Sequence, residues 1–161
     1  MRRLAATPAQ LEELYRARFE QFSRVASAIC CDPELGRDAV QSGFAAAVDK
    51  RRSFRGEGPL EAWVWRIVVN EARRLARDAH PSASLEAWPE PAANGSGADP
   101  LGVRAWIAVL PERQREAVFL RYYADLDYEQ IAAVAGVARG TVAATLHATH
   151  ARLRDVLGEV R

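Results

Sequence analysis

The sequence predicts an all-α protein made of two small helical domains joined by a flexible linker. Apolar residues recur at helical spacing over 8–79 and again over 101–158, and neither segment shows the apolar–polar alternation of a β-strand. Between them, residues 80–100 are rich in Pro, Ala, Ser and Gly and have no periodicity. The chain has 161 residues, 49% of them hydrophobic, so each domain can bury a core. We therefore expect domains at 8–79 and 101–161 and a linker at 80–100.

Three helices are expected in the first domain, each with a proline near its start. Pro8, Pro33 and Pro59 suit a first helical turn, where a missing N–H costs no hydrogen bond. The spacing predicts a shared core formed by Leu11, Leu14, Tyr15, Phe22, Ala26 and Ile29 in the first helix, Leu35, Ala39, Val40, Phe44, Ala47 and Val48 in the second, and Leu60, Trp63, Val64, Ile67, Val68 and Leu75 in the third.

The remaining arc of the third expected helix combines an aromatic ring, an amide and four basic side chains: Trp65, Arg66, Asn70, Arg73, Arg74 and Arg77. Such groups can stack on unpaired bases, hydrogen-bond to base edges and hold phosphates. The alternative is that Trp63 and Trp65 belong to the core and that the arginines only solvate a helix face. The residue pattern by itself leaves both interpretations open.

The second domain has the pattern of a helix-turn-helix motif. Leu110-Pro111-Glu112 predicts the start of one helix, and Asp127 is a residue type that caps the start of the next. That second helix leads to Gly136, and three residues later a longer amphipathic helix begins. Two helices around a tight glycine turn form a helix-turn-helix, although many other helical hairpins share the pattern. The apolar side of the last helix is expected to comprise Val142, Leu146, Leu153 and either Val156 or Leu157.

The composition argues against several functional classes. No Ser/His/Asp arrangement, glycine-rich phosphate loop or paired carboxylate cluster occurs, so we expect no enzyme and no cofactor. Cys30 and Cys31 are adjacent, which suits neither a mutual disulfide nor a metal site. His147 and His150 lack a third ligand, so no metal is expected. No run approaches the roughly 20 apolar residues that cross a bilayer, and we expect a cytoplasmic protein without membrane insertion.

Two segments resemble bacterial sigma factors of the extracytoplasmic-function (ECF) group. Residues 110–157 resemble region 4 of that family, through LPERQRE, DYEQIA and GTV near ARLR. Residues 37–78, which contain FRGEG, resemble region 2. The resemblance implies a promoter-recognition subunit with a region 2 helical bundle and a region 4 helix-turn-helix. It also implies three partners, which are core RNA polymerase (its β′ coiled coil and β flap), promoter DNA and an anti-sigma protein.

The resemblance assigns roles to individual residues. Polymerase docking falls to Arg37, Asp38, Gln41 and Phe44; their alternative roles are a solvated helix face and, for Phe44, the core. Phe54 and Asn70 match a pocket that captures a flipped base. Recognition of the minus-ten element falls to Phe54, Arg55, Trp63, Arg66, Asn70, Arg73, Arg74 and Arg77, and that of the minus-35 element to Arg139, Gly140, Thr141, Ala143, Ala144 and His147.

The helix that follows GTV departs from the family pattern. The family usually continues with basic and small polar residues, whereas this chain has Ala143, Ala144 and Thr145, and no permanently positive side chain between Arg139 and Arg152. Fewer phosphate contacts mean weaker DNA binding by this domain. Two hypotheses follow. One is a working sigma factor; the other is a sigma-like protein-interaction module that binds polymerase or an anti-sigma protein without initiating alone.

Overall fold

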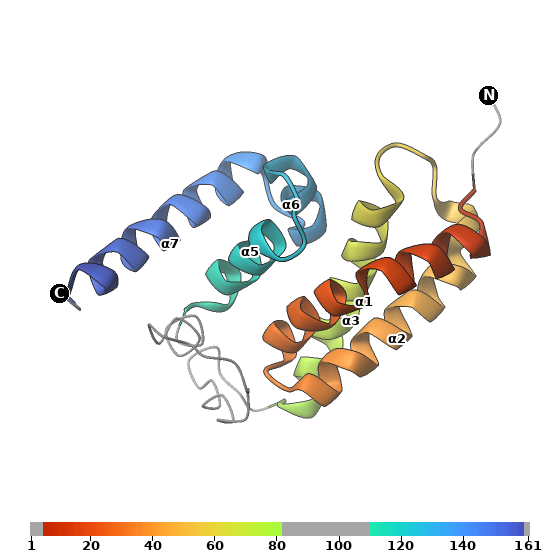
Figure 1. Cartoon of the computed structure of the whole chain (residues 1–161), viewed down its shortest axis with the longest axis horizontal. Helices are drawn as coiled ribbons and strands as arrows, with labels where there is room; N and C mark the ends of the chain where they lie inside the picture. Colours follow the sequence, from red (N-terminus) through yellow and green to blue (C-terminus); the bar gives the residue numbers. More distant parts are fainter. Residues whose placement is uncertain (1–4, 82–109, 160–161) are drawn as a thin grey trace.

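The computed structural model describes residues 5–81 and 110–159, and every regular element within them is helical. No strand occurs in this described part, which confirms the all-α fold class. Most of the expected linker at 80–100, and residues 101–109 of the expected second domain, lie outside it. The elements (Figure 1) are α1 (Pro8–Cys30), α2 (Pro33–Lys50), the 3-10 helix η1 (Arg51–Ser53), α3 (Leu60–Ala79), α5 (Glu112–Tyr122), α6 (Tyr128–Ala135) and α7 (Arg139–Glu159).

Side-chain caps fix the starts of α1 and α2 close to the prolines that predicted them. At α1, Thr7 Oγ1 accepts a hydrogen bond from Gln10 N (3.2 Å), and Gln10 Oε1 accepts one from Thr7 N (2.9 Å). At α2, Asp32 Oδ1 accepts one from Glu34 N (2.8 Å). Each bond satisfies a backbone N–H that the first helical turn would otherwise leave unpaired. The local sequence therefore determines where these helices begin.

Helices α1, α2 and α3 pack around a group of aromatic side chains. The rings of Phe22 and Trp65 are fully buried and stacked, with centroids 3.9 Å apart, and Phe44 meets Phe22 edge-on at 5.1 Å. The expectation that Trp65 lies on the exposed arc is wrong, because its ring fills the space between α3 and α1. The core alternative is correct for this residue. Val48, expected in the core, is 38% exposed.

Helices α5, α6 and α7 form the helix-turn-helix that the sequence predicts. Asp127 caps α6 in a capping box with Gln130, whose N donates to Asp127 Oδ1 at 2.8 Å. Gly136 ends α6 with φ 70°, a left-handed conformation that favours glycine. After this turn α7 leaves at 104° to α6. The fully or nearly fully buried side chains of this unit include Leu120, Ile131, Val142 and Leu146.

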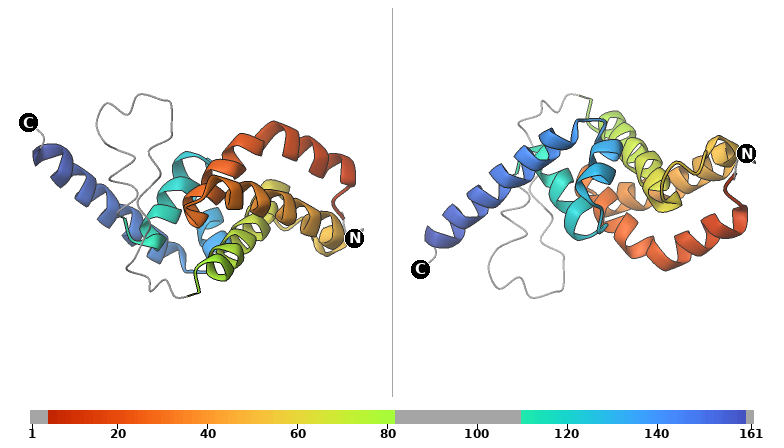
Figure 2. Two further views of the ribbon diagram at one scale, coloured as in Figure 1. Left: turned by 90° about the horizontal axis from the view of Figure 1, so that it is seen from below. Right: turned by 90° about the horizontal axis from the view of Figure 1, so that it is seen from above.

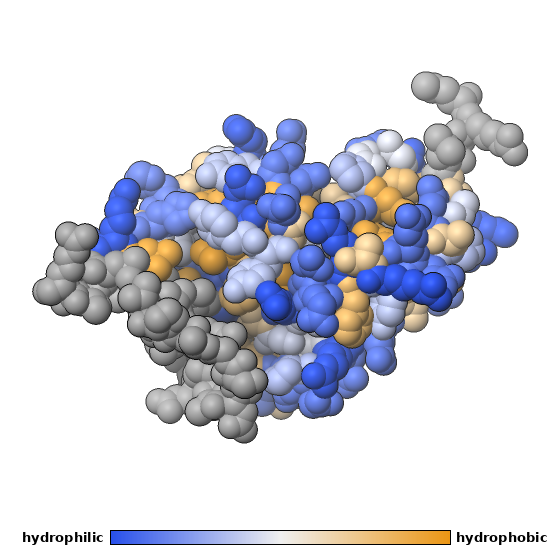
Figure 3. Space-filling model, in the orientation of Figure 1, coloured by the Kyte–Doolittle hydropathy of each residue, from blue (hydrophilic) through white to orange (hydrophobic). Residues whose placement is uncertain are grey.

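The two helical units lie against each other. Helix α5 contacts α1, and α6 contacts α3, so the second unit covers part of the bundle (Figures 1 and 2). The face of the molecule in Figure 3 is mostly hydrophilic, with small groups of apolar residues between charged ones. Helix α7 extends away from the bundle, so most of its length is free of contact with α1–α3 (Figure 2).

No single helix in the described part of the chain is both long and apolar enough to cross a membrane. Taken together, α6 and residues 139–155 of α7 reach the length and apolar composition of a membrane span, but the two helices are bent by 104° where they meet.

Two glycines let α2 pack closely on its neighbours. A Cβ added to Gly36 would lie 2.6 Å from Ser27 N and 2.7 Å from Ser27 Cα, both backbone atoms of α1. A Cβ on Gly43 would lie 2.8 Å from a methyl group of Val68 on α3. Backbone atoms cannot move aside as a side chain can, so Gly36 is the stricter requirement.

We therefore expect Gly36→Ala to lower the free energy of unfolding by about 1–3 kcal/mol, because α2 would have to shift away from α1. Urea denaturation followed by circular dichroism measures the change. Gly140→Ala is the matched control, since no atom lies within 4 Å of the added methyl. Equal unfolding free energies for the two variants would contradict the close approach of α1 and α2.

Candidate nucleic-acid interface

Phe54 and Trp63 form an aromatic pair at the start of α3. Their ring centroids are 5.5 Å apart at an interplanar angle of 54°, and both side chains are only partly buried. The loop between them exposes Arg55, and nothing lies within 4 Å of the position a Cβ would take on Gly56 or Gly58. Two partly exposed rings beside an open loop can stack against a planar group.

Glu61, in the first turn of α3, contacts one side chain of α3 and one of α1. Trp65 Nε1 donates a hydrogen bond to Glu61 Oε1 at 3.5 Å, and Arg18 Nε of α1 lies 3.5 Å from the same oxygen. One carboxylate thus links α1 to α3 next to the buried indole. No motif or spacing in the sequence points to Glu61, because its partner Arg18 is 43 residues away along the chain.

One face of α3 carries Arg66, Asn70, Arg73 and Arg77, which follow each other at intervals of four, three and four residues; we call it the basic face. Arg66, Asn70 and Arg77 are exposed. Within the described residues, Arg66 and Arg77 form no ion pair. Asn70 Oδ1 accepts a weak hydrogen bond from Arg73 Nη1 at 3.5 Å. The structure therefore brings these predicted residues together on one surface.

Arg74 differs from the basic face because acidic side chains of its own helix surround it. Its Nη2 lies 2.5 Å from Glu71 Oε1 and its Nη1 lies 3.0 Å from Asp78 Oδ2. The hydrogen bond to Glu71 raises the pKa of the Arg74 guanidinium. With two carboxylates on one guanidinium, the local charge is not positive, and a phosphate gains little from this arginine.

The predicted docking residues of α2 divide into two groups. Arg37, Asp38 and Gln41 are exposed along one side of the helix, with Arg37 Nη1 2.8 Å from Glu34 Oε1. Phe44 is 7% exposed and packs edge-on against Phe22, so its position fits the core alternative. The first group is accessible to a partner protein, whereas Phe44 packs α2 onto the core of the bundle.

Helix α7 presents most of the predicted minus-35 residues to solvent. Arg139, Gly140, Thr141, Ala144 and His147 are exposed, while Ala143 is partly buried. Arg139 lies over the ring of Tyr128, 5.9 Å from its centroid. The opposite side of the helix packs through Val142, Leu146 and Thr149. Ala144, rather than Ala143, therefore lies at the centre of the exposed face.

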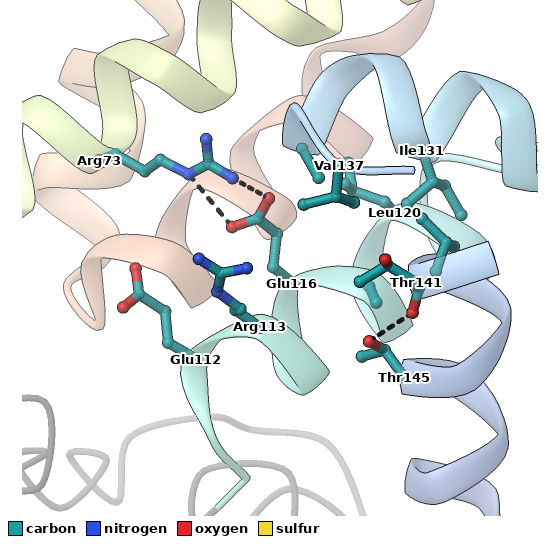
Figure 4. A pocket seen from close by; sticks show the side chains of 12 residues that line it. Arg73, Glu112, Arg113, Glu116, Leu120, Ile131, Val137, Thr141 and Thr145 are labelled. Atoms are coloured by element: carbon teal, nitrogen blue, oxygen red, sulfur yellow. Dashed lines mark hydrogen bonds and ion pairs between the residues drawn. The ribbon is translucent and has the colours of Figure 1, made fainter. Parts of the chain in front are cut away.

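Arg73 and Glu116 connect the two helical units. Arg73 Nη2 pairs with Glu116 Oε1, and Arg73 Nε donates to Glu116 Oε2 at 3.3 Å (Figure 4). The Glu116 side chain is 5% exposed and that of Arg73 27%. A cavity of about 290 Å³ adjoins the pair (Figure 4). Its lining combines charged side chains with apolar and hydroxyl ones: Arg73, Glu112, Arg113, Glu116, Ala117, Leu120, Ile131, Ala135, Val137, Thr141, Val142 and Thr145.

Glu116 is not among the site residues that the sequence predicts, although its position on α5 indicates a buried charge. It precedes Leu120 by four residues, so it falls on the apolar side of α5, where an unpaired charge would be costly. Burial raises the pKa of the Glu116 carboxyl, and the nearby Arg73 acts in the opposite direction. A charged residue on a buried helix face indicates a partner, but the sequence does not say which one.

The two cysteines are free thiols, with Cys30 buried and Cys31 partly buried. Burial raises the pKa of Cys30 and that of Cys31 to about 12 each, so the thiolate is scarce at neutral pH. Cys30 Sγ donates to Ala72 O at 3.4 Å. In the described parts of the chain, no three His, Cys, Asp or Glu side chains are grouped so as to hold a metal ion. His150 Nε2 lies 2.7 Å from the Tyr122 hydroxyl instead.

Comparison with known proteins identifies the family to which this chain belongs. The family model described as Sigma-70 region 2 matches residues 14–81, and that described as Sigma-70, region 4 matches residues 102–153. The RNA polymerase sigma-E factor of Streptomyces coelicolor is 29% identical over 92% of this chain and 86% of its own length. The ECF RNA polymerase sigma factor SigM of Mycobacterium tuberculosis is 32% identical over 91% of this chain and 76% of its own.

A solved structure resembles both helical units together. The sigma factor RpoE of Bartonella quintana, crystallised in complex with the anti-sigma factor NepR, matches with a TM-score of 0.71 and 26% identity, covering 93% of this chain and 98% of the other. The two family regions occur in one chain in the expected order, and they account for the bundle and for the helix-turn-helix. The chain therefore belongs to the ECF sigma factors of the sigma-70 family.

Proposed function

We propose that this sigma factor directs RNA polymerase to promoters, with region 2 reading and melting the minus-ten element and region 4 reading the minus-35 element. The observation that carries the proposal is the placement of the Phe54–Trp63 pair directly beside the basic face of α3. Aromatic rings next to unpaired guanidinium groups are the combination that binds single-stranded DNA. Arg55, exposed in the intervening loop, adds a further positive charge.

Base capture by region 2 follows from these positions. Extruding one base from a duplex costs a few kcal/mol, and stacking on an aromatic ring returns about 1–3 kcal/mol. The rings of Phe54 and Trp63 supply the stacking surface, and Asn70 supplies an amide that can hydrogen-bond to a base edge. Arg66 and Arg77 hold the phosphates on either side. After the duplex has melted, these contacts keep the bound DNA strand single-stranded.

Partner binding falls to surfaces outside this site. The exposed side chains of Arg37, Asp38 and Gln41 on α2 form the proposed docking surface for the β′ coiled coil of core polymerase, and region 4 docks on the β flap. Phe44 contributes by supporting α2. The Bartonella quintana neighbour is in complex with an anti-sigma factor, which supports an anti-sigma protein as a further partner of this chain.

The exposed face of α7 favours a second candidate function. Between Arg139, which lies over Tyr128, and Arg152, that face carries no permanent positive charge, and its centre is Ala144. A weak minus-35 reader fits a sigma-like protein-interaction module that binds polymerase or an anti-sigma protein without initiating alone. Run-off transcription with core polymerase and genomic DNA fragments separates the two candidates, because only a working sigma factor yields discrete transcripts.

The first prediction of the proposed function concerns melting. We expect Phe54→Ala to lower open-complex formation on duplex promoters about tenfold, because one base stack is lost. On templates already unpaired at the minus-ten element the loss should be smaller, since melting is no longer required. Permanganate footprinting of unpaired thymines and run-off yield measure both. Equal losses on the two templates would indicate a folding defect and would contradict the capture role.

A second prediction separates free from neutralised arginines on α3. Arg66→Ala should reduce the slope of log affinity against log salt for single-stranded DNA by about 0.7, the value of one lost phosphate contact. Arg74→Ala is the matched control and should leave the slope nearly unchanged, because Glu71 and Asp78 already hold its guanidinium. Fluorescence anisotropy across a salt series measures both slopes. Equal reductions would contradict the assignment of the basic face.

A third prediction tests the exposed face of α7. Ala144→Arg places a positive charge at an exposed position, and arginine is a good helix former, so the helix should remain intact. The slope of log affinity against log salt for duplex DNA should steepen by about 0.9. Ala45→Arg, on the exposed side of α2, is the control that adds the same charge elsewhere. If both variants give the same slope, α7 does not face DNA and the protein-interaction candidate is favoured.

A further inference from the structure

The cavity beside α5 has a charged side and a mostly apolar side. The side chains of Glu112 and Arg113 project from the first turn of α5 toward Arg73, next to Glu116 (Figure 4). The other side is formed by α5, α6, α7 and the turn before α7, and its residues are Ala117, Leu120, Ile131, Ala135, Val137, Thr141, Val142 and Thr145. A few charged groups beside an apolar surface are typical of a small-molecule site.

Two of the four charged groups of this cavity are available to a ligand. Arg73 and Glu116 pair with each other. Within the described residues, the side chains of Glu112 and Arg113 form no ion pair. Arg113 is exposed and Glu112 is partly buried. A carboxylate and a guanidinium at adjacent positions therefore both face the cavity without a partner there.

The balance of charge selects the class of ligand. Arg73 and Arg113 balance Glu112 and Glu116, so the formal charge of the lining is zero. A simple anion meets repulsion from Glu112, and a simple cation meets repulsion from Arg113. A zwitterion avoids both, because its carboxylate can bind the Arg113 guanidinium while its ammonium group donates to the Glu112 carboxylate.

The volume and the apolar side limit the rest of the ligand. The cavity measures about 290 Å³, close to the lower end of the roughly 300–1,000 Å³ of ligand pockets. A ligand of the size of one amino acid fits such a volume. Leu120, Ile131 and Val142 offer an apolar surface to its side chain. The Thr145 hydroxyl already donates to Thr141 O at 2.8 Å, so an apolar group beside it leaves no donor unpaired.

We propose that this cavity binds a free apolar α-amino acid of the size of leucine. Arg113 binds the carboxylate, Glu112 binds the ammonium group, and Leu120, Ile131 and Val142 contact the side chain. The inference goes beyond promoter recognition, because none of these residues belongs to the proposed DNA-binding or polymerase-docking surfaces.

The test measures binding of L-leucine to the full-length chain by NMR titration of the backbone amide signals. We expect saturable shifts around the cavity with a millimolar Kd, because so small a ligand makes few contacts. L-leucinamide lacks the carboxylate, and N-acetyl-L-leucine lacks the ammonium group. Each should bind about tenfold more weakly, the value of one charge-assisted hydrogen bond.

Two variants assign each charged contact to one group of the ligand. Arg113→Gln should weaken L-leucine binding about tenfold and leave L-leucinamide binding unchanged, since the amide has no carboxylate to lose. Glu112→Gln should weaken L-leucine binding in the same way and leave N-acetyl-L-leucine binding unchanged. Arg152→Gln is the matched control, because Arg152 is an exposed arginine of α7 outside the cavity, and it should change the affinity little.

A further variant tests the apolar side. Ala135→Leu places a larger side chain in the cavity, so L-leucine binding should be lost while circular dichroism shows unchanged helix content. Three results would each overturn the inference: no saturable shifts in the parent chain, equal effects of Arg113→Gln and Arg152→Gln, or full L-leucine binding by a folded Ala135→Leu variant.

Discussion

The stacked rings of Phe22 and Trp65 are the contact on which the geometry of region 2 depends. They lie 3.9 Å apart in the fully buried centre of the bundle, and they fix the rotation of α3 about its axis. Two positions before the buried indole, Trp63 is turned toward Phe54 at the surface. One position after it, Arg66 is turned to solvent. A rotation of α3 would bury the arginine and separate the aromatic pair, so the core determines which side of α3 is exposed.

Electrostatics then assign different roles to arginines of one helix. Arg74 is held by two carboxylates of α3 itself, which are fixed by helical spacing. Arg73 is held by Glu116, a carboxylate from the other region. Arg66 is exposed and forms no ion pair within the described residues. The pairing of Arg74 follows from helical spacing, whereas the pairing of Arg73 requires the folded chain to bring Glu116 close. The accessibility of each arginine to a further anion thus depends on the carboxylates that surround it.

Helix periods and start signals in the sequence were sufficient to predict the fold class and most helix starts. Asp127 and Gly136 determine where α6 begins and ends, because a capping side chain and a left-handed turn act over a few residues. The resemblance to sigma regions 2 and 4 likewise rests on short motifs within single helices. Local interactions of this kind are encoded in neighbouring residues, and a single sequence therefore shows them.

The tertiary structure decided what the helical period could not. The period leaves two sides of α3 for Trp65, and packing against α1 buried it; it allowed Phe44 to dock a partner, and packing against Phe22 placed it in the core. Nothing near Arg73 in the sequence identifies Glu116, 43 residues away, as its partner. The sequence by itself determined the helices, their caps and the residue types available for DNA. Burial and ion pairing are sums over residues distant in sequence, so only the folded chain decided which side chains are free.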